Sequence, residues 1–121
     1  MGNIGMNRLK NVEFYKWDIW YADIAFEDMP NISKIRPVLI IDSKKPIILT
    51  LKMFSHKPFS KYQENNMYLI QEWQKAGLSN PTVINVKSPV WLDLKFFKKK
   101  IGVLHAKDRK AVMQFLSKLN I

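Results

Sequence analysis

The sequence predicts a mainly β fold with some α structure, an α+β domain built on a small, strongly bent β-sheet or barrel. Three observations support this prediction: several short β-rich runs, long polar loops between them, and an amphipathic helix near the end of the chain. A chain of 121 residues, 47% of them hydrophobic, suits one domain with one core. We expect residues 1–13 to be a flexible leader and residues 14–121 to form that domain.

The first half of the chain contains three predicted strands. Residues 17–26 are rich in aromatic and β-branched residues and alternate in places between apolar and polar. Residues 36–42 form a continuous apolar run, typical of a buried strand. Residues 47–54 are again β-rich, and the turn residues at 43–46 predict a hairpin between these two runs. Residues 27–34 contain proline, asparagine and serine, so we expect a loop there.

The second half contains shorter predicted strands. After a polar loop at residues 56–66, residues 67–70 have the composition of a short strand, and residues 82–86 predict another. Residues 90–92 extend that strand beyond Pro89. Because proline interrupts the hydrogen-bond ladder of a strand, we expect a bend or a sheet edge at this point.

Two helices are also predicted. Residues 70–76 predict a short helix that Gly77 ends in the left-handed conformation. Residues 106–119 predict a C-terminal helix that His105 caps. The apolar face of this helix has side chains three and four residues apart: Val112, Phe115, Leu116 and Leu119. The segment 95–104 carries mixed signals, with aromatic residues and lysines before an apolar run.

The charge of the chain predicts a polyanionic partner, either nucleic acid or an acidic protein. The formal net charge is +10 and the sequence pI is near 9.9. A soluble basic protein without such a partner is the alternative. The charge is also segregated along the sequence, because between positions 34 and 61 only Asp42 opposes a set of basic residues: Lys34, Arg36, Lys44, Lys45, Lys52, Lys57 and Lys61. This distribution favours a basic surface.

Two absences narrow the class of protein further. The chain has no cysteine, which excludes disulfides and thiolate metal sites and suits a reducing cytoplasm. No uncharged apolar stretch approaches the ~20 residues of a membrane span. We therefore expect a cytoplasmic protein that does not cross a membrane.

Three motifs, in order along the chain, resemble the MazF/PemK family of type II toxin–antitoxin endoribonucleases, also called mRNA interferases. D-I-W-Y-A-D from Asp18, followed after a loop by K-I-R-P-V-L-I-I-D from Lys34, resembles the opening of the family. E-W-Q-K-A-G-L from Glu72 is similar to a W-x-x-A-G-L insert of some members, and K-K-I-G-V-L from Lys99 to a K-x-I-G-x-L motif before the last helix. The resemblance covers most of the chain and implies an SH3-like barrel with attached helices.

This resemblance implies a toxin that cleaves single-stranded RNA without a metal or another cofactor. In the family's usual mechanism, the ribose 2′-OH attacks the adjacent phosphate and the 5′-oxygen leaves. The reaction needs a base for the 2′-OH, an acid for the 5′-oxygen, and donors that stabilise the extra negative charge on phosphorus. The resemblance also implies a homodimer that is inhibited by an acidic, partly disordered antitoxin protein.

The candidate catalytic residues are Arg36, Ser55 and His56. Arg36 opens a predicted strand, its guanidinium can fork onto two phosphate oxygens, and the resemblance places it in the family's catalytic site. Relatives resemble T-S-H-K-P where this chain has F-S-H-K-P, so Phe54 stands at the active-site threonine and Ser55 is the candidate substitute. The imidazole of His56 suits proton transfer at neutral pH. A surface arginine and a solvated loop histidine are the alternatives.

Four further residues are candidate RNA ligands: Lys34, Lys57, Asn85 and Lys87. Lysine side chains bind phosphate, and an asparagine amide reads the edge of a base. Asn85 and Lys87 stand where some relatives, with R-x-D-Q-P, have arginine and aspartate. Solvated lysines on an ordinary surface are again the alternative.

The departures from the family pattern leave a second hypothesis open. Phe54 for threonine, Asn85 for arginine and Lys87 for aspartate favour a catalytically degenerate RNA- or protein-binding module. Trp17 replaces the glycine of many members, so we expect the local backbone or the dimer edge to differ. A DNA-binding autoregulator is the weakest hypothesis, because no segment has the context of a helix-turn-helix.

Overall fold

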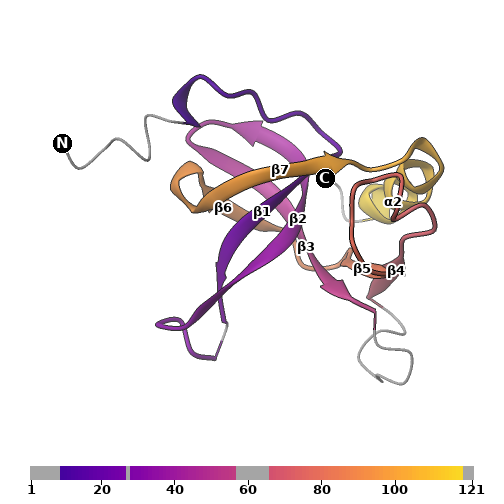
Figure 1. Ribbon diagram of the computed structural model, residues 1–121, viewed down its shortest axis with the longest axis horizontal. Coiled ribbons are helices and arrows are strands. Elements are labelled where there is room, and N and C mark those ends of the chain that lie inside the picture. The colour runs from indigo at the N-terminus through magenta and orange to yellow at the C-terminus, as the bar shows by residue number, and fades with distance from the viewer. Residues whose placement is uncertain (1–8, 27, 57–65, 119–121) are drawn as a thin grey trace.

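The computed structural model describes residues 9–26, 28–56 and 66–118, in which seven strands form one antiparallel sheet with a helix beside it (Figure 1). In chain order the elements are β1 (Asp18–Ala25), β2 (Ser33–Lys44), β3 (Ile47–Ser55), β4 (Met67–Leu69), β5 (Thr82–Asn85), β6 (Val90–Asp93), the 3-10 helix η2 (Leu94–Phe96), β7 (Phe97–Val103) and α2 (Ala106–Lys118). The mainly β prediction with a C-terminal helix is therefore confirmed. None of the described helices is long and apolar enough to cross a membrane.

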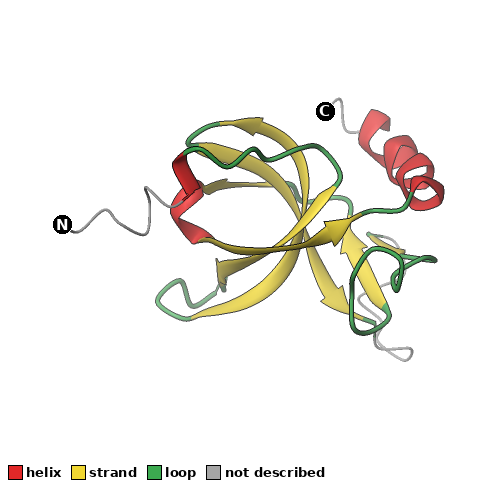
Figure 2. Cartoon of the chain, turned by 45° about the horizontal axis from the view of Figure 1, so that its top comes forward, coloured by secondary structure: helices red, strands yellow, loops and turns green. Residues whose placement is uncertain are grey.

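The strands follow the order β4-β5-β3-β2-β1-β7, and β6 lies off this path. The outer edge of β3 is shared, since β6 pairs with its first half and β5 with its last three residues. This arrangement agrees with the predicted bend at Pro89, which lies between the two strands. Within the described residues, no pairing joins β7 to β4 or β6, so closure into a barrel stays a prediction. Figure 2 shows the strong twist of the strands.

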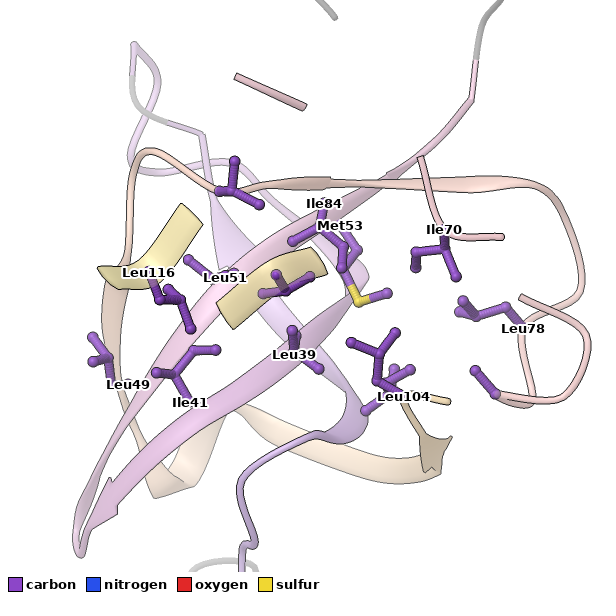
Figure 3. Packing of buried hydrophobic residues seen from close by; sticks show 14 residues of the cluster. Leu39, Ile41, Leu49, Leu51, Met53, Ile70, Leu78, Ile84, Leu104 and Leu116 are labelled. Atoms are coloured by element: carbon purple, nitrogen blue, oxygen red, sulfur yellow. The ribbon is translucent and has the colours of Figure 1, made fainter. Parts of the chain in front are cut away.

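The central strands β1, β2 and β3 are buried on both faces. Alternating side chains on one face pack with α2 and the turn before β5, and Figure 3 shows this helix-side core. It comprises Ile19, Leu39, Ile41, Leu49, Leu51, Met53, Ile70, Ala76, Leu78, Ile84, Val86, Leu104, Val112 and Leu116. The intervening side chains form the opposite core: Leu9, Phe14, Trp20, Ala22, Ile24, Val38, Ile40, Ile48, Leu92, Leu94 and Phe97.

The described end of the predicted leader packs against the opposite core. Leu9 is only 2% exposed, and the ring of Phe14 lies 4.5 Å from that of Trp20 between centroids. The Lys45 Nζ donates hydrogen bonds to two backbone oxygens of this segment, including that of Val12. Residues 9–13 are therefore packed on the sheet, while residues 1–8 lie outside the described residues. The domain boundary at residue 14 stays a prediction.

The backbone before β1 adopts the conformation that favours glycine. Trp17, which stands at a glycine position of the family pattern, has a φ of 80°. Its amide donates to the Ile40 oxygen at 2.8 Å, and its oxygen accepts from the Leu104 amide at 2.8 Å. Next to it, the buried Asp18 carboxylate lies 3.3 Å from the Lys100 ammonium. These contacts join β2 and the end of β7 to the start of β1.

The predicted helix over residues 70–76 is wrong. Its residues form turns, because a segment this short does not repay the cost of starting a helix. The predicted stop is confirmed: Gly77 has a φ of +92°, its amide donates to the Gln74 oxygen, and the Leu78 amide donates to the Trp73 oxygen, both at 3.1 Å. These two bonds form a Schellman motif at the end of a single turn.

The turn ending at Gly77 meets β7 backbone to backbone at Gly102. A Cβ added to Gly102 would lie 2.1 Å from the Ala76 oxygen, and one added to Gly77 would lie 2.7 Å from the Ile101 oxygen. Real Cβ atoms do not approach oxygen this closely. Glycine is therefore required on both sides of the contact.

Helix α2 is attached to the sheet through a fully buried carboxylate. Asp108 accepts hydrogen bonds from the Tyr68 hydroxyl at 2.6 Å, the Gln71 amide at 2.8 Å and the Glu72 amide at 2.9 Å. Burial raises the pKa of Tyr68 above its usual range, and the hydrogen bond from its hydroxyl to Asp108 and the negative charge of Asp108 raise it further. The predicted cap is also confirmed, because the His105 Nδ1 accepts from an amide in the first turn.

We predict that Gly102→Ala lowers the free energy of unfolding by about 3 kcal/mol, the upper end of overpacking costs, because the Ala76 backbone has to move. Urea denaturation of the purified protein measures this change. The matched control is Gln114→Ala on the exposed face of α2, which should stay within about 0.5 kcal/mol of the parent. Equal stabilities of the two variants would contradict the close approach.

We also predict that Asp108→Ala lowers the free energy of unfolding by about 3 kcal/mol, because three buried donors lose their acceptor. Tyr68→Phe should cost only about 1 kcal/mol, since the two backbone donors keep the carboxylate. Thermal and urea unfolding measure both changes. Glu13→Ala removes an exposed carboxylate and serves as the control, and an Asp108→Ala protein as stable as this control would refute the prediction.

Candidate active site

Arg36 lies on β2 at the point where the opposite core ends. Its backbone pairs with Ala22 on β1, and its half-buried side chain lies on the same face as Val38 and Ile40. The pairing between β2 and β3 stops at Val38 and Lys52. Beyond that pair, β2 continues beside β1 and β3 continues beside β5, so the two strands diverge (Figure 1). Arg36 is therefore placed at the fork between them.

Two phenylalanine rings hold the Arg36 guanidinium. Its Cζ lies 4.8 Å from the ring centroid of Phe54 on β3 and 5.8 Å from that of Phe26, which follows β1. Both distances are in the range of cation–π contacts. The guanidinium donates no hydrogen bond to any residue in the described part of the chain. Its N–H donors thus remain available for a ligand.

Two lysines lie on the same sheet face as Arg36. Lys34 is exposed and pairs with Ile24, while the half-buried Lys52 pairs with Val38. Because paired residues of antiparallel strands point to the same face, these cations gather on adjacent strands around Arg36. Lys52 is not among the predicted site residues, although the alternation within residues 47–54 and the predicted hairpin indicate its face. The result is a basic face suited to an anion.

The sheet separates Ser55 from Arg36. Ser55 follows Phe54 directly on β3 and pairs with Thr82, so its exposed side chain lies on the opposite face, with Met53. The predicted substitute hydroxyl is therefore not brought to the guanidinium.

His56 lies at the end of β3 in different surroundings. Its amide donates to the Pro81 oxygen at 2.9 Å. The residue lines a cavity of about 290 Å³ together with Trp73 and Ile70, a member of the helix-side core. Because His56 is two residues beyond Phe54 and its amide bond to Pro81 continues the strand pairing, the alternation of β3 directs it to the Phe54 face.

The candidate RNA ligands beyond β3 have mixed placements. Asn85 is the last residue of β5 and lies two residues after Val83, which pairs with Phe54. Its side chain is therefore on the same face of the sheet as Phe54. Its Oδ1 accepts from the Lys87 amide at 3.1 Å, which occupies that oxygen in a local turn. Lys87 is exposed next to it, and Lys57 lies outside the described residues.

These features define a small basic β-sheet protein with a candidate anion site around Arg36. Residues 15–119 match the family described as PemK-like, MazF-like toxin of type II toxin-antitoxin system. The chain belongs to this family of toxins, as the motifs around Arg36, Gly77 and Gly102 indicated.

Two solved structures have a similar fold. A mycobacterial endoribonuclease in complex with its cognate antitoxin has a TM-score of 0.66 at 8% sequence identity, over 88% of this chain and 93% of that chain. The Mycobacterium tuberculosis toxin MazF-mt6 has a TM-score of 0.63 at 17% identity, over 84% of this chain and 93% of that chain. No curated protein sequence is significantly similar to the chain. At these sequence identities, the similarity to the two structures shows a shared fold.

Proposed function

We propose that this chain is an endoribonuclease toxin that cleaves single-stranded RNA through attack of the ribose 2′-OH on the adjacent phosphate. The observation that carries the proposal is the Arg36 guanidinium, which lies within cation–π distance of two rings and has no hydrogen bond to a described residue. Membership of the toxin family supports the proposal, and so does the fold shared with a mycobacterial endoribonuclease and with the toxin MazF-mt6. The nucleophile belongs to the substrate, so the mechanism requires no metal.

In this proposal Arg36 stabilises the negative charge that develops on phosphorus. A guanidinium stays protonated near neutral pH and offers a planar fork to two phosphate oxygens, but it is a poor proton carrier. Lys34 and Lys52 on the same face hold neighbouring phosphates. His56 remains the proposed proton carrier and Ser55 the proposed hydroxyl. Ser55 needs a rearrangement at the end of β3 to reach the Arg36 face.

A second candidate function is an RNA-binding module of the same fold that no longer cleaves. Phe54 at the position of the active-site threonine favours this candidate, and so does the placement of Ser55 on the other face. Both candidates use the same basic face. They differ in whether a bond is broken, which makes them separable by experiment.

We further propose a cytoplasmic homodimer whose basic face is covered by an acidic antitoxin. The net charge of +10 favours an acidic partner. One structure of similar fold was solved with its cognate antitoxin bound. Because RNA and an acidic peptide would compete for the same cations, each is expected to displace the other, and both to bind more weakly as salt rises.

The first functional prediction concerns the nucleophile. Purified protein incubated with a long RNA in excess EDTA should cleave it and leave 5′-hydroxyl ends, because the reaction uses the 2′-OH. An otherwise identical RNA with 2′-deoxyribose at the mapped scissile position should resist cleavage. Arg36→Ala protein, purified in parallel, controls for contaminating nucleases. Cleavage of the deoxy-substituted RNA at the same position would exclude the mechanism, and binding without cleavage would favour the RNA-binding module.

The second functional prediction concerns Arg36. Arg36→Lys keeps the charge but loses the planar fork, so single-turnover cleavage should fall by about 10²–10³-fold while RNA affinity changes far less. His56→Ala should also lower the single-turnover rate, because the proposed proton carrier is lost. Fluorescence anisotropy with labelled RNA measures affinity, and Lys110→Gln on α2 is the control for charge. Equal losses of binding and cleavage in Arg36→Lys would remove Arg36 from the transition state.

A further inference from the structure

We propose, resting on the function proposed above, that Phe54 and Phe26 are positioning residues that orient the Arg36 guanidinium toward the scissile phosphate. The aromatic stack would then supply the order that a hydroxyl at position 54 cannot provide. This assigns Phe54 a role in the reaction. Without such a role, its presence at the position of the family's active-site threonine would indicate only the loss of a catalytic group.

Among the described residues, the two rings are the side chains that contact and order the Arg36 guanidinium. Arginine is long and flexible, and an unanchored guanidinium samples many rotamers. Within the described residues, Arg36 has neither an ion pair nor a hydrogen bond, and its interactions are the ring contacts at 4.8 and 5.8 Å. Its half-buried position is therefore maintained by stacking and by the backbone pairing of β2.

Both rings are attached to hydrogen-bonded backbone. The backbone of Phe54 pairs with Val83 on β5, so the position of its ring is fixed by the sheet on one side of the fork. Phe26 donates its amide to the Ile32 oxygen at 2.9 Å, which fixes it beside the end of β1 on the other side. Arg36 on β2 lies between these two anchors. The guanidinium is thus bracketed by rings from two neighbouring segments of the sheet.

Aromatic contacts order an arginine without using its charge or its donors. A carboxylate partner would order an arginine but would also neutralise its charge and occupy its N–H fork. A ring contacts the face of the guanidinium through its π electrons and leaves the N–H groups at the edge unpaired. An arginine held in this way keeps both the charge and the donors that a phosphate requires. This suits transition-state stabilisation better than an ion pair would.

The experiment compares Phe54→Leu, which removes the π face, with Phe54→Tyr, which keeps it. Phe96→Leu is the matched control, because it removes an exposed ring that lies 5.2 Å from the Lys95 ammonium at a distant position. Three quantities are measured for each variant: the NMR resonance of the Arg36 side-chain Nε–H, the affinity for a mixed-sequence 2′-O-methyl RNA that cannot be cleaved, and the single-turnover rate on unmodified RNA. Phe26→Leu provides an independent test should Phe54→Leu fail to fold.

We expect Phe54→Leu to remove the ring-current shift of the Arg36 resonance and to lower the single-turnover rate by about 5- to 30-fold, the range of a lost cation–π contact. Phe54→Tyr should retain the shift and stay within about twofold of the parent rate, and Phe96→Leu should match the parent. A parental resonance and rate in both Phe54→Leu and Phe26→Leu would overturn the proposal. If the parent cleaves no RNA, the proposed function fails, yet the resonance and the affinity for 2′-O-methyl RNA still decide whether the rings position Arg36.

Discussion

The divergence of β2 from β3 beyond the Val38–Lys52 pair determines where this protein presents its polar chemistry. Up to that pair, two clusters of buried apolar side chains occupy the two faces of the central strands. Past it, each strand follows a different neighbour, and the opposite core ends. Arg36 is the first side chain of β2 on that face beyond the core, so its exposure and its surroundings follow from strand pairing.

The ring contacts at this fork change how the departures from the family pattern are interpreted. Taken alone, a phenylalanine at a threonine position suggests a lost catalytic group. Next to Arg36, the same residue is the nearer of the two rings that contact the guanidinium. Loss of a hydroxyl and gain of an ordered guanidinium are opposite effects on the same reaction. Sequence comparison registers the first effect, whereas the second depends on geometry.

The sequence predicted most of the strands, because the alternation and the apolar runs around residues 36–42 reflect burial directly. The predicted start of β2 was wrong, since the strand begins at Ser33, inside the predicted loop of residues 27–34. The sequence also implied the separation of Phe54 and Ser55. Neighbouring residues of a strand point to opposite faces, so these two side chains could not belong to one site. Three features could not be predicted. The fork at Arg36 depends on which partners β3 takes beyond Lys52, the acceptor role of Asp108 depends on tertiary docking, and the single turn before Gly77 resembled a helix by composition.

The contact between Gly77 and Gly102 links two motifs that are far apart in the sequence. Gly102 is needed because of the Ala76 backbone that faces it, whereas Gly77 is needed for its φ of +92° as well as for the Ile101 backbone that faces it. A chain that lacks the turn around Gly77 also lacks the Ala76 oxygen that excludes a side chain at position 102. Across the evolution of such chains, the requirement for glycine at position 102 should be lost together with the turn, and a glycine at position 102 without the turn would be a relic of an ancestor that possessed it.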